Sequence, residues 1–201
     1  KWASLRDNVM EYGELADLVH EYNPTVRSNR STLSDKKNQD LTEINDKLLS
    51  DAMDLWDDAS STDTDSYMGR MTAANLDFAG NTLAQTADKN FMDAEMYKIS
   101  YDQTEANLVF QAQQLMTTYK QSAYTMENLN ANRALAQASY EATVARQAAG
   151  MATQTEVLTS LKNVQDIDAN ILSAQKSTDN VYRSLLLMLG WSADSQPEIR
   201  D

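Results

Sequence analysis

Cysteine is absent from this chain of 201 residues, and glycine, proline and histidine are scarce, with five, two and one copies respectively. Without cysteine the chain can form neither a disulfide nor a thiolate metal site. The single histidine, His20, has no second histidine with which to build a zinc site, and a histidine-based catalytic triad is not expected. Because turns depend on glycine and proline, their scarcity predicts few turns and therefore long elements.

Long apolar runs are also absent. The longest covers 185–189, far short of the roughly 20 residues that a membrane-spanning helix needs, so we expect no direct membrane span in this chain. Negative charge is present in excess, because 30 Asp and Glu residues outnumber 17 Lys and Arg residues and give a net charge of −13. A surface this acidic repels phosphate backbones, so nucleic acid is not an expected partner.

Two stretches, 81–149 and 151–189, contain neither glycine nor proline and are separated only by Gly150. As continuous helices they would extend about 100 Å and about 58 Å at 1.5 Å per residue. Within the first stretch, gaps of four and three residues form a heptad seam that is apolar at most positions. The seam runs through Leu108, Ala112, Leu115, Tyr119, Ser122, Met126, Leu129, Arg133, Ala136 and Tyr140. This pattern predicts an antiparallel coiled-coil hairpin that closes at Gly150.

Helical periodicity and turn signals place the other elements. The predicted helices span about 2–20, 24–58, 67–149 and 154–189. Asn23-Pro24 is a favoured helix start, and the polar stretch 59–66 reads as a loop. Gly190 followed by Trp191 is typical of a Schellman helix end, and 191–201 reads as a tail or linker. The predicted fold is all-α, a single domain over 1–190 with an elongated antiparallel coiled-coil hairpin, one additional long helix and a short N-terminal helix.

The hairpin tip, 149–156, carries the clearest local signals. Gly150 can adopt the left-handed conformation that ends a helix. Thr153 and Glu156 have the spacing of a capping box, in which the threonine hydroxyl accepts from the glutamate N–H and the glutamate carboxylate accepts from the threonine N–H. One helix is therefore expected to end and the next to begin within about four residues.

Catalytic, cofactor and metal sites are not expected. Asp63 and Asp65 lie in the polar loop, but the glycine and closing glutamate of a calcium loop are missing. Asp166 and Asp168 are two residues apart on a helix, so their side chains point to different sides. Asp168 falls close to the apolar seam, where a polar residue typically fixes the register of the two paired helices. Two paired rods offer little concavity for a reaction, so we expect no enzyme.

The segment 150–158 resembles the periplasmic hairpin tip of TolC-like outer membrane efflux proteins. Gly150-Met151 matches the turn of that family, and Thr155-Glu156-Val157 matches the restart of the returning helix. Asn23-Pro24 is similar to the start of the family's second helix, and the run 185–190 is similar to the end of the returning helix. The resemblance is to the helical hairpin region, since 59–66 is too short for the pair of transmembrane strands that the family carries there.

The resemblance implies a non-enzymatic efflux or export duct component outside the cytoplasm, in the periplasm or at the cell envelope or surface. It implies self-assembly through the coiled-coil helices, docking of a membrane-fusion-type adaptor protein through the tip, and cooperation with an inner-membrane transporter. The residues that would form or support the docking edge are Gly150, Met151, Thr153, Thr155, Glu156 and Val157.

A second interpretation needs no transport role. The same helices and tip would serve a structural or signalling extracytoplasmic coiled-coil spacer, because the capping box and Gly150 explain the turn on structural grounds alone. The two interpretations differ in the expected partners of the tip.

Overall fold

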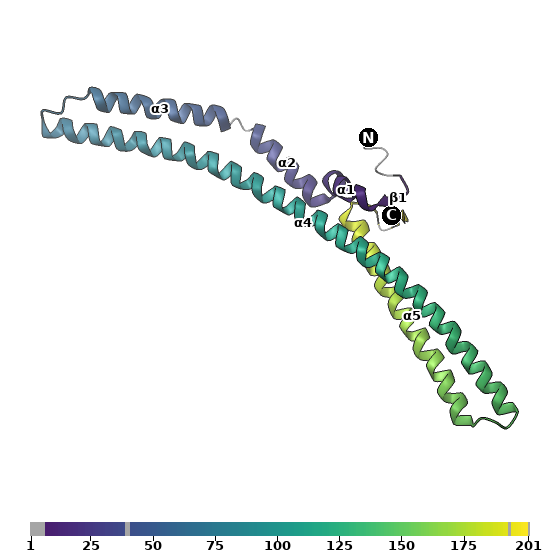
Figure 1. The fold of residues 1–201 in the computed structure, drawn as a ribbon. Helices are drawn as coiled ribbons and strands as arrows, with labels where there is room; N and C mark the ends of the chain where they lie inside the picture. Colours follow the sequence, from purple (N-terminus) through teal and green to yellow (C-terminus); the bar gives the residue numbers. More distant parts are fainter. Residues whose placement is uncertain (1–6, 39–40, 193, 201) are drawn as a thin grey trace. The chain divides into compact units, whose positions relative to one another are not determined.

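The computed structural model describes residues 7–38, 41–192 and 194–200. Its elements are β1 (Val9–Glu11), the 3₁₀ helix η1 (Tyr12–Glu14), α1 (Leu15–Tyr22), α2 (Pro24–Asn38), α3 (Leu41–Ser61), α4 (Tyr67–Ala148), α5 (Gln154–Met188) and β2 (Glu198–Arg200). The chain is almost entirely helical, which confirms the all-α fold class, and α4 with α5 forms the expected antiparallel hairpin (Figure 1). Among the described residues, no helix combines the length and apolar character that a membrane span requires.

The chain divides into two compact units. The first unit comprises the described residues up to Pro24 and those from Asn107 onward, and the second comprises Thr25–Ala106. The continuous helix α4 contributes residues to both units.

In the first unit, α5 packs along the C-terminal part of α4 (Figure 1). The predicted seam of α4 supplies buried Ala112 and Ala136, while α5 supplies buried Val157 and Val164. Arg133 occupies a seam position, and its Nε donates to Asp168 Oδ1 of α5 at 2.8 Å. The polar seam residue therefore meets the carboxylate of Asp168, and this half-exposed ion pair joins the two helices.

The other end of α5 enters the most closely packed part of the first unit. Leu185, Leu186 and Leu189 are buried there, as are Leu15 and Leu18 of α1. The backbone N–H of Gly190 donates to the Leu187 carbonyl, and that of Trp191 donates to the Leu186 carbonyl. These two bonds make the Schellman end that the sequence predicted, with Gly190 at φ 67°.

The N-terminal segment differs from the predicted helix over 2–20. Residues 2–6 lie outside the described part, Val9–Glu11 forms β1, and α1 begins only at Leu15. β1 pairs in parallel with β2, which lies within the predicted tail 191–201, with Met10 opposite Ile199. Pairing with β2 supplies hydrogen-bond partners for the backbone groups of β1, so that these groups do not need the local bonds of a helix. Met10 is completely buried in this arrangement.

In the second unit, α3 lies antiparallel to α4 (Figure 1). The predicted helix over 24–58 is present as α2 and α3, and residues 39–40 between them lie outside the described part. Gly80 of α4 permits the close approach of α3, because a Cβ there would lie 2.6 Å from the Trp56 indole nitrogen. Asn90 of α4 donates to the Asn45 side chain of α3 at 3.2 Å.

Candidate functional site

The turn between α4 and α5 begins with a second Schellman end. Gly150 has φ 72°, its N–H donates to the Gln147 carbonyl at 2.8 Å, and the Met151 N–H donates to the Arg146 carbonyl at 2.8 Å. These bonds satisfy carbonyls that the end of a helix otherwise leaves without partners. Apart from its two chain neighbours, no described residue lies within 4 Å of the position that a Cβ on Gly150 would take, so the conformation, and not crowding, requires glycine.

The start of α5 carries the predicted capping box. The Glu156 N–H donates to the Thr153 hydroxyl oxygen at 3.2 Å, and the Thr153 N–H donates to the Glu156 carboxylate at 2.6 Å. The backbone N–H and the hydroxyl of Thr153 both donate to that carboxylate and hold the pKa of Glu156 below its ordinary value. The nearby Arg146 guanidinium lowers the same pKa further.

Two side-chain contacts tie the two sides of the turn together. Arg146 in the last turn of α4 donates to the Met151 carbonyl at 3.1 Å, and Gln147 donates to the Gln154 side chain at 2.5 Å. A cation in the last turn of a helix also complements the negative end of the helix dipole. The polar groups of the turn therefore bond largely to one another, which makes its shape well defined.

The predicted docking residues do not all lie at the surface. Met151 is 66% exposed, and Thr153, Thr155 and Glu156 are exposed. Val157 is only 8% exposed and belongs to the hairpin core. Its neighbour Leu158 is 55% exposed and is not among the docking residues that the resemblance implies. Met151 and Leu158 are therefore two large apolar side chains that are accessible near the turn.

A shallow open groove of about 580 Å³ lies beside the turn, between the end of α4 and the start of α5. It is lined by Thr143, Arg146, Thr153, Thr155, Glu156, Thr159, Ser160 and Asn163. Hydroxyl groups dominate this lining, but Thr143 and Thr159 already donate to helix carbonyls four residues earlier. The groove offers a polar surface next to Met151, and the contact between the Thr153 hydroxyl and the Glu156 carboxylate in its lining belongs to the capping box.

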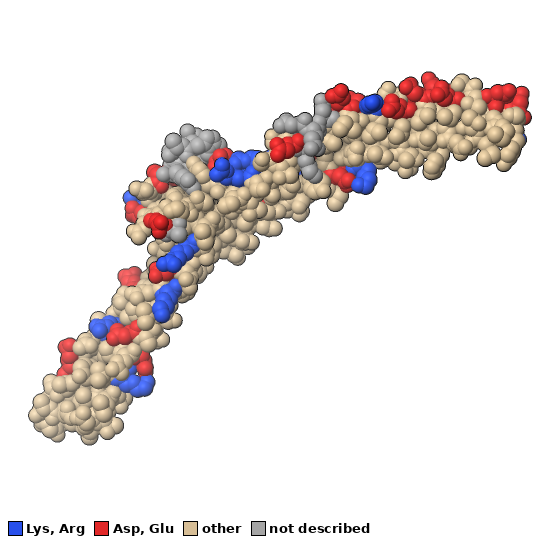
Figure 2. Space-filling model, turned by 180° about the vertical axis from the view of Figure 1, so that it is seen from behind, with Lys and Arg blue, Asp and Glu red and all other residues tan. Residues whose placement is uncertain are grey.

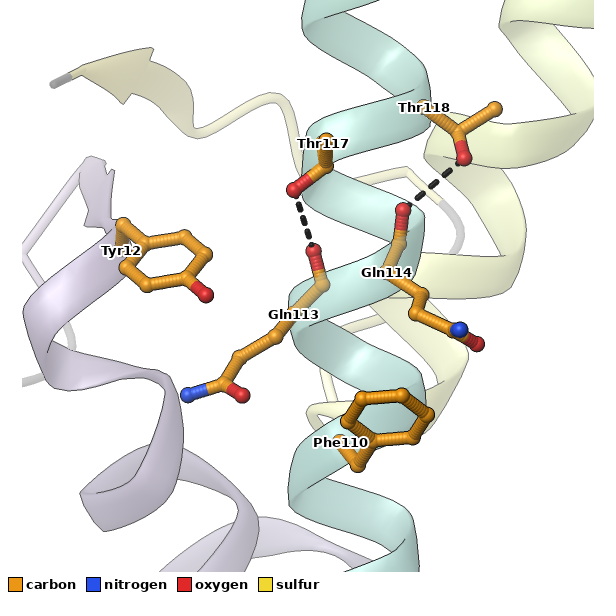
Figure 3. A pocket seen from close by; sticks show the side chains of 6 residues that line it. All are labelled: Tyr12, Phe110, Gln113, Gln114, Thr117 and Thr118. Carbon is orange, nitrogen blue, oxygen red and sulfur yellow. Dashed lines mark hydrogen bonds between the residues drawn. The ribbon is translucent and has the colours of Figure 1, made fainter.

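A second open hollow, of about 500 Å³, lies in the first unit against the middle of α4. It is lined by Tyr12, Phe110, Gln113, Gln114, Thr117 and Thr118. Figure 3 shows the Gln113 side chain reaching towards the segment that carries Tyr12, while the two threonine hydroxyls bond to carbonyls of their own helix. The Tyr12 phenol is the one ionisable side chain in this lining, which otherwise consists of amide, hydroxyl and phenyl groups.

The acidic residues weighed as cation or acid–base candidates have local partners. Asp63 Oδ1 accepts from the Asp65 N–H at 2.9 Å, and Asp166 pairs with Lys162 at 2.6 Å. Within the described ranges, no three His, Cys, Asp or Glu side chains gather as they would around a metal ion. The turn at Gly150 is therefore the candidate functional site.

Acid is expected to loosen this turn through Glu156. Because the folded-state pKa lies below the ordinary value of 4.5, the carboxylate's contribution is complete above that value and is lost as the pH falls through the folded-state pKa. The Thr153 amide proton resonance should therefore shift between about pH 6 and pH 2, with its midpoint below the ordinary pKa. A midpoint at or above 4.5 would contradict the bonding described.

Glu156→Gln is the matched control for this titration. Glutamine keeps an oxygen that can accept from the Thr153 N–H but does not titrate. We expect this variant to keep the turn at neutral pH and to lose the acid-induced shift of the Thr153 resonance.

Comparison with the known proteins adds no relative to this description. Models of protein families, curated proteins and solved structures give no match to the chain. The resemblance to TolC-like proteins therefore rests on the residues that carry it, namely the Gly150 turn, the Asn23-Pro24 helix start and the apolar run that ends at Gly190.

Proposed function

We propose that this chain is a non-enzymatic component of a TolC-like efflux or export duct. In this proposal the chain acts outside the cytoplasm, assembles with copies of itself, and docks a membrane-fusion-type adaptor protein through the Gly150 turn. The adaptor in turn links it to an inner-membrane transporter. The resemblance of the turn residues motivates the choice of partner, and the geometry of the turn supports the docking role.

One observation carries the docking proposal: a well-defined turn presents a large apolar side chain to solvent. Met151 is 66% exposed, and the backbone on both sides of it is held by the Schellman end and the capping box. A preorganised apolar group loses little conformational freedom on binding, so more of its burial appears as affinity. Methionine also adapts its shape to the surface that it meets.

The residues around Met151 suit a partner with hydrogen-bonding groups at its edge. Arg146 and Glu156 flank the polar groove, and Leu158 adds a second exposed apolar side chain. An apolar centre within a polar rim is the usual arrangement of a protein interface. Val157 contributes indirectly, because its burial between the helices fixes the start of α5.

Met151→Glu is expected to weaken adaptor binding by about 2 kcal/mol or more, roughly thirtyfold, because a charge would have to be buried at the centre of the contact. The binding partner to measure is the adaptor encoded beside this chain's gene, by calorimetry or surface plasmon resonance. Helix content by circular dichroism should not change, because Met151 lies outside both helices.

Leu172→Glu is the matched control. Leu172 is a 53% exposed apolar residue of α5 far along the helix from the turn, so the same charge is added without touching the docking edge. Adaptor affinity of Leu172→Glu should stay near the wild-type value. Equal affinities of wild type and Met151→Glu would overturn docking through the turn.

The spacer interpretation has one observation in its favour. Because the polar groups of the turn bond to one another, the turn is a stable helix connection without any partner. A spacer would be favoured if Met151→Glu binds the adaptor as tightly as wild type does and the neighbouring genes encode a kinase or a cell-wall anchor. An adaptor or ABC-transporter gene beside this one would favour efflux.

A further inference from the structure

A stripe of large apolar side chains on α4 is exposed in the second unit. Phe78 is 73% exposed, Met96 is 66% exposed and Met92 is 63% exposed. Met71 and Ile99 are exposed as well and complete the stripe. At 100° per residue these five residues fall within about 80° of one another around the helix, and at 1.5 Å per residue the stripe is about 42 Å long.

The stripe lies on the side of α4 away from α3. Gly80 and Ala87 mark the side that faces α3, because Gly80 lies against Trp56 and Ala87 is only 3% exposed. At 100° per residue, Phe78 lies about 160° around the helix from Gly80, and Met92 lies about 140° from Ala87. The described packing of the second unit therefore leaves the stripe without a cover.

One edge of the stripe carries a row of exposed carboxylates, about 80–120° around the helix from Phe78. The row consists of Asp77, Asp88, Glu95 and Asp102. None of the four forms an ion pair with a described Lys or Arg, whereas Asp93 on the other edge is paired with Lys89 at 2.7 Å. Four negative charges thus lie beside the stripe without a positive partner.

The basic residues near the row leave these charges uncompensated. Arg70 lies on the same edge, seven residues before Asp77, and its guanidinium donates to the carbonyls of Thr64 and Asp65. Lys98 is one helical turn from Glu95 but forms no ion pair with a described residue. Acidic side chains also gather along the α3 edge of the unit (Figure 2). The surroundings of the stripe are therefore negative.

We propose that the α4 stripe docks an amphipathic helix of a partner protein that carries Lys or Arg along one flank. This inference goes beyond the proposed function and does not depend on it. A long helical face whose apolar side chains are three, four or seven residues apart is a surface on which a second helix packs.

The acidic row determines the charge of that helix. Carboxylates on one edge of an apolar contact attract a basic flank, fix the orientation of the partner and repel an acidic one. A second copy of this chain would bring a further net charge of −13 to the same surface, so a basic helix suits it better.

A synthetic peptide of about four heptads, with Leu at positions a and d and Lys along one flank, is the probe. The same peptide with Glu in place of Lys is its matched control. Fluorescence anisotropy of each labelled peptide, titrated with the full chain, gives the dissociation constants. We expect the lysine peptide to bind at least tenfold more tightly than the glutamate peptide.

Variants of the chain distinguish this docking from general attraction between opposite charges. Asp88→Asn with Glu95→Gln should raise the dissociation constant of the lysine peptide at least fivefold. Asp51→Asn with Asp54→Asn removes the same charge from exposed positions of α3 and should change it less than twofold. Equal losses in the two double variants would overturn the inference.

The apolar part of the contact is tested by Met92→Gln, which adds no charge and should also raise the dissociation constant at least fivefold. Leu172→Gln, at a 53% exposed position of α5, should change it less than twofold. Unchanged binding in Met92→Gln, or no binding of the lysine peptide to wild type, would exclude the stripe as its docking surface.

Two further measurements separate this inference from the proposed function. Met151→Glu, which should impair adaptor docking, should bind the lysine peptide as wild type does, and a loss there would place the peptide at the Gly150 turn instead. Sedimentation velocity detects self-association of the full chain. If wild type self-associates and Met92→Gln abolishes that association, a second copy occupies the stripe and the basic helix is the wrong partner.

Discussion

Gly190→Ala is expected to lower the free energy of unfolding by about 3 kcal/mol or more. Gly190 has φ 67°, and a Cβ there would collide with the Tyr22 carbonyl oxygen. An L-residue in the left-handed region costs about 1–2 kcal/mol, and forcing a methyl group into a packed contact adds about 1–3 kcal/mol. The contact joins the end of α1 to the end of α5, so neither backbone can move without disturbing the packing of Leu185 and Leu189.

Gly150→Ala is the control that separates conformation from contact. Gly150 has a similar φ of 72°, but among the residues that the structure describes only its chain neighbours come within 4 Å of where a Cβ would lie. This variant should therefore cost only the conformational term of about 1–2 kcal/mol. Urea unfolding followed by circular dichroism measures both variants. Equal losses of unfolding free energy at the two glycines would show that the contact with Tyr22 adds nothing to the cost of replacing Gly190.

The sequence predicted the hairpin closely because the signals for helix ends are local. The Gly150 turn and the Thr153–Glu156 capping box each depend on residues within five positions of one another. The observed α4 and α5 end within about a residue of the expected bounds for the same reason. The heptad seam placed Ala112 and Ala136 in the core, since the period of a pattern determines which face of a helix packs.

The strand pair could not be predicted in this way. β1 and β2 have three residues each and are nearly the whole chain apart, so neither shows a recognisable alternation. Pro197 is buried, and its carbonyl accepts a hydrogen bond from the Tyr182 hydroxyl at 2.8 Å. Both features likewise depend on how the C-terminal segment folds back. Such contacts arise from tertiary packing, which overrides the local preference for a helix or a loop.

The geometry of the Gly150 turn was predicted from its residues, but the direction of every side chain was not. Val157 was assigned to the docking edge through the family resemblance, yet the register of the coiled coil turns it inward and Leu158 outward. A rotation of 100° between consecutive helical residues is enough to exchange core and surface. Motif matching alone does not resolve that difference, whereas the gaps of four and three residues that join Val157, Leu161 and Val164 indicate that Val157 faces the partner helix.

Asn23 has a second role that the sequence did not reveal. The sequence identified it as a helix start before Pro24, but its side-chain amide also donates to the Met188 carbonyl at 2.7 Å. Met188 ends α5, so this carbonyl belongs to the group that the helix itself leaves without partners. Asn23 is only 4% exposed, and solvent cannot readily replace the lost bond. The amide thereby fastens the end of the returning helix to the residue that follows α1.

Asn23→Asp is therefore expected to lower the free energy of unfolding by about 3 kcal/mol at neutral pH, more than the roughly 1–3 kcal/mol expected for Asn23→Ala. Aspartate has almost the same shape as asparagine but lacks the amide donor. Its carboxylate would face the Met188 carbonyl at the negative end of α5. Urea unfolding at several pH values measures the loss. Asn130→Asp adds the same charge at an exposed position of α4 and should change stability by less than about 0.5 kcal/mol.

The pH dependence of Asn23→Asp distinguishes a lost hydrogen bond from a simple change in packing. Burial beside a carbonyl raises the pKa of the introduced carboxyl in the folded state, so its destabilising effect is present above that pKa and is relieved as the pH falls through it. A protonated carboxyl can donate to the Met188 carbonyl as the amide does. The stability of Asn23→Asp should therefore approach wild type towards acid pH, while Asn23→Ala keeps its deficit. A deficit of Asn23→Asp that stays constant with pH would exclude the Asn23–Met188 bond as the cause.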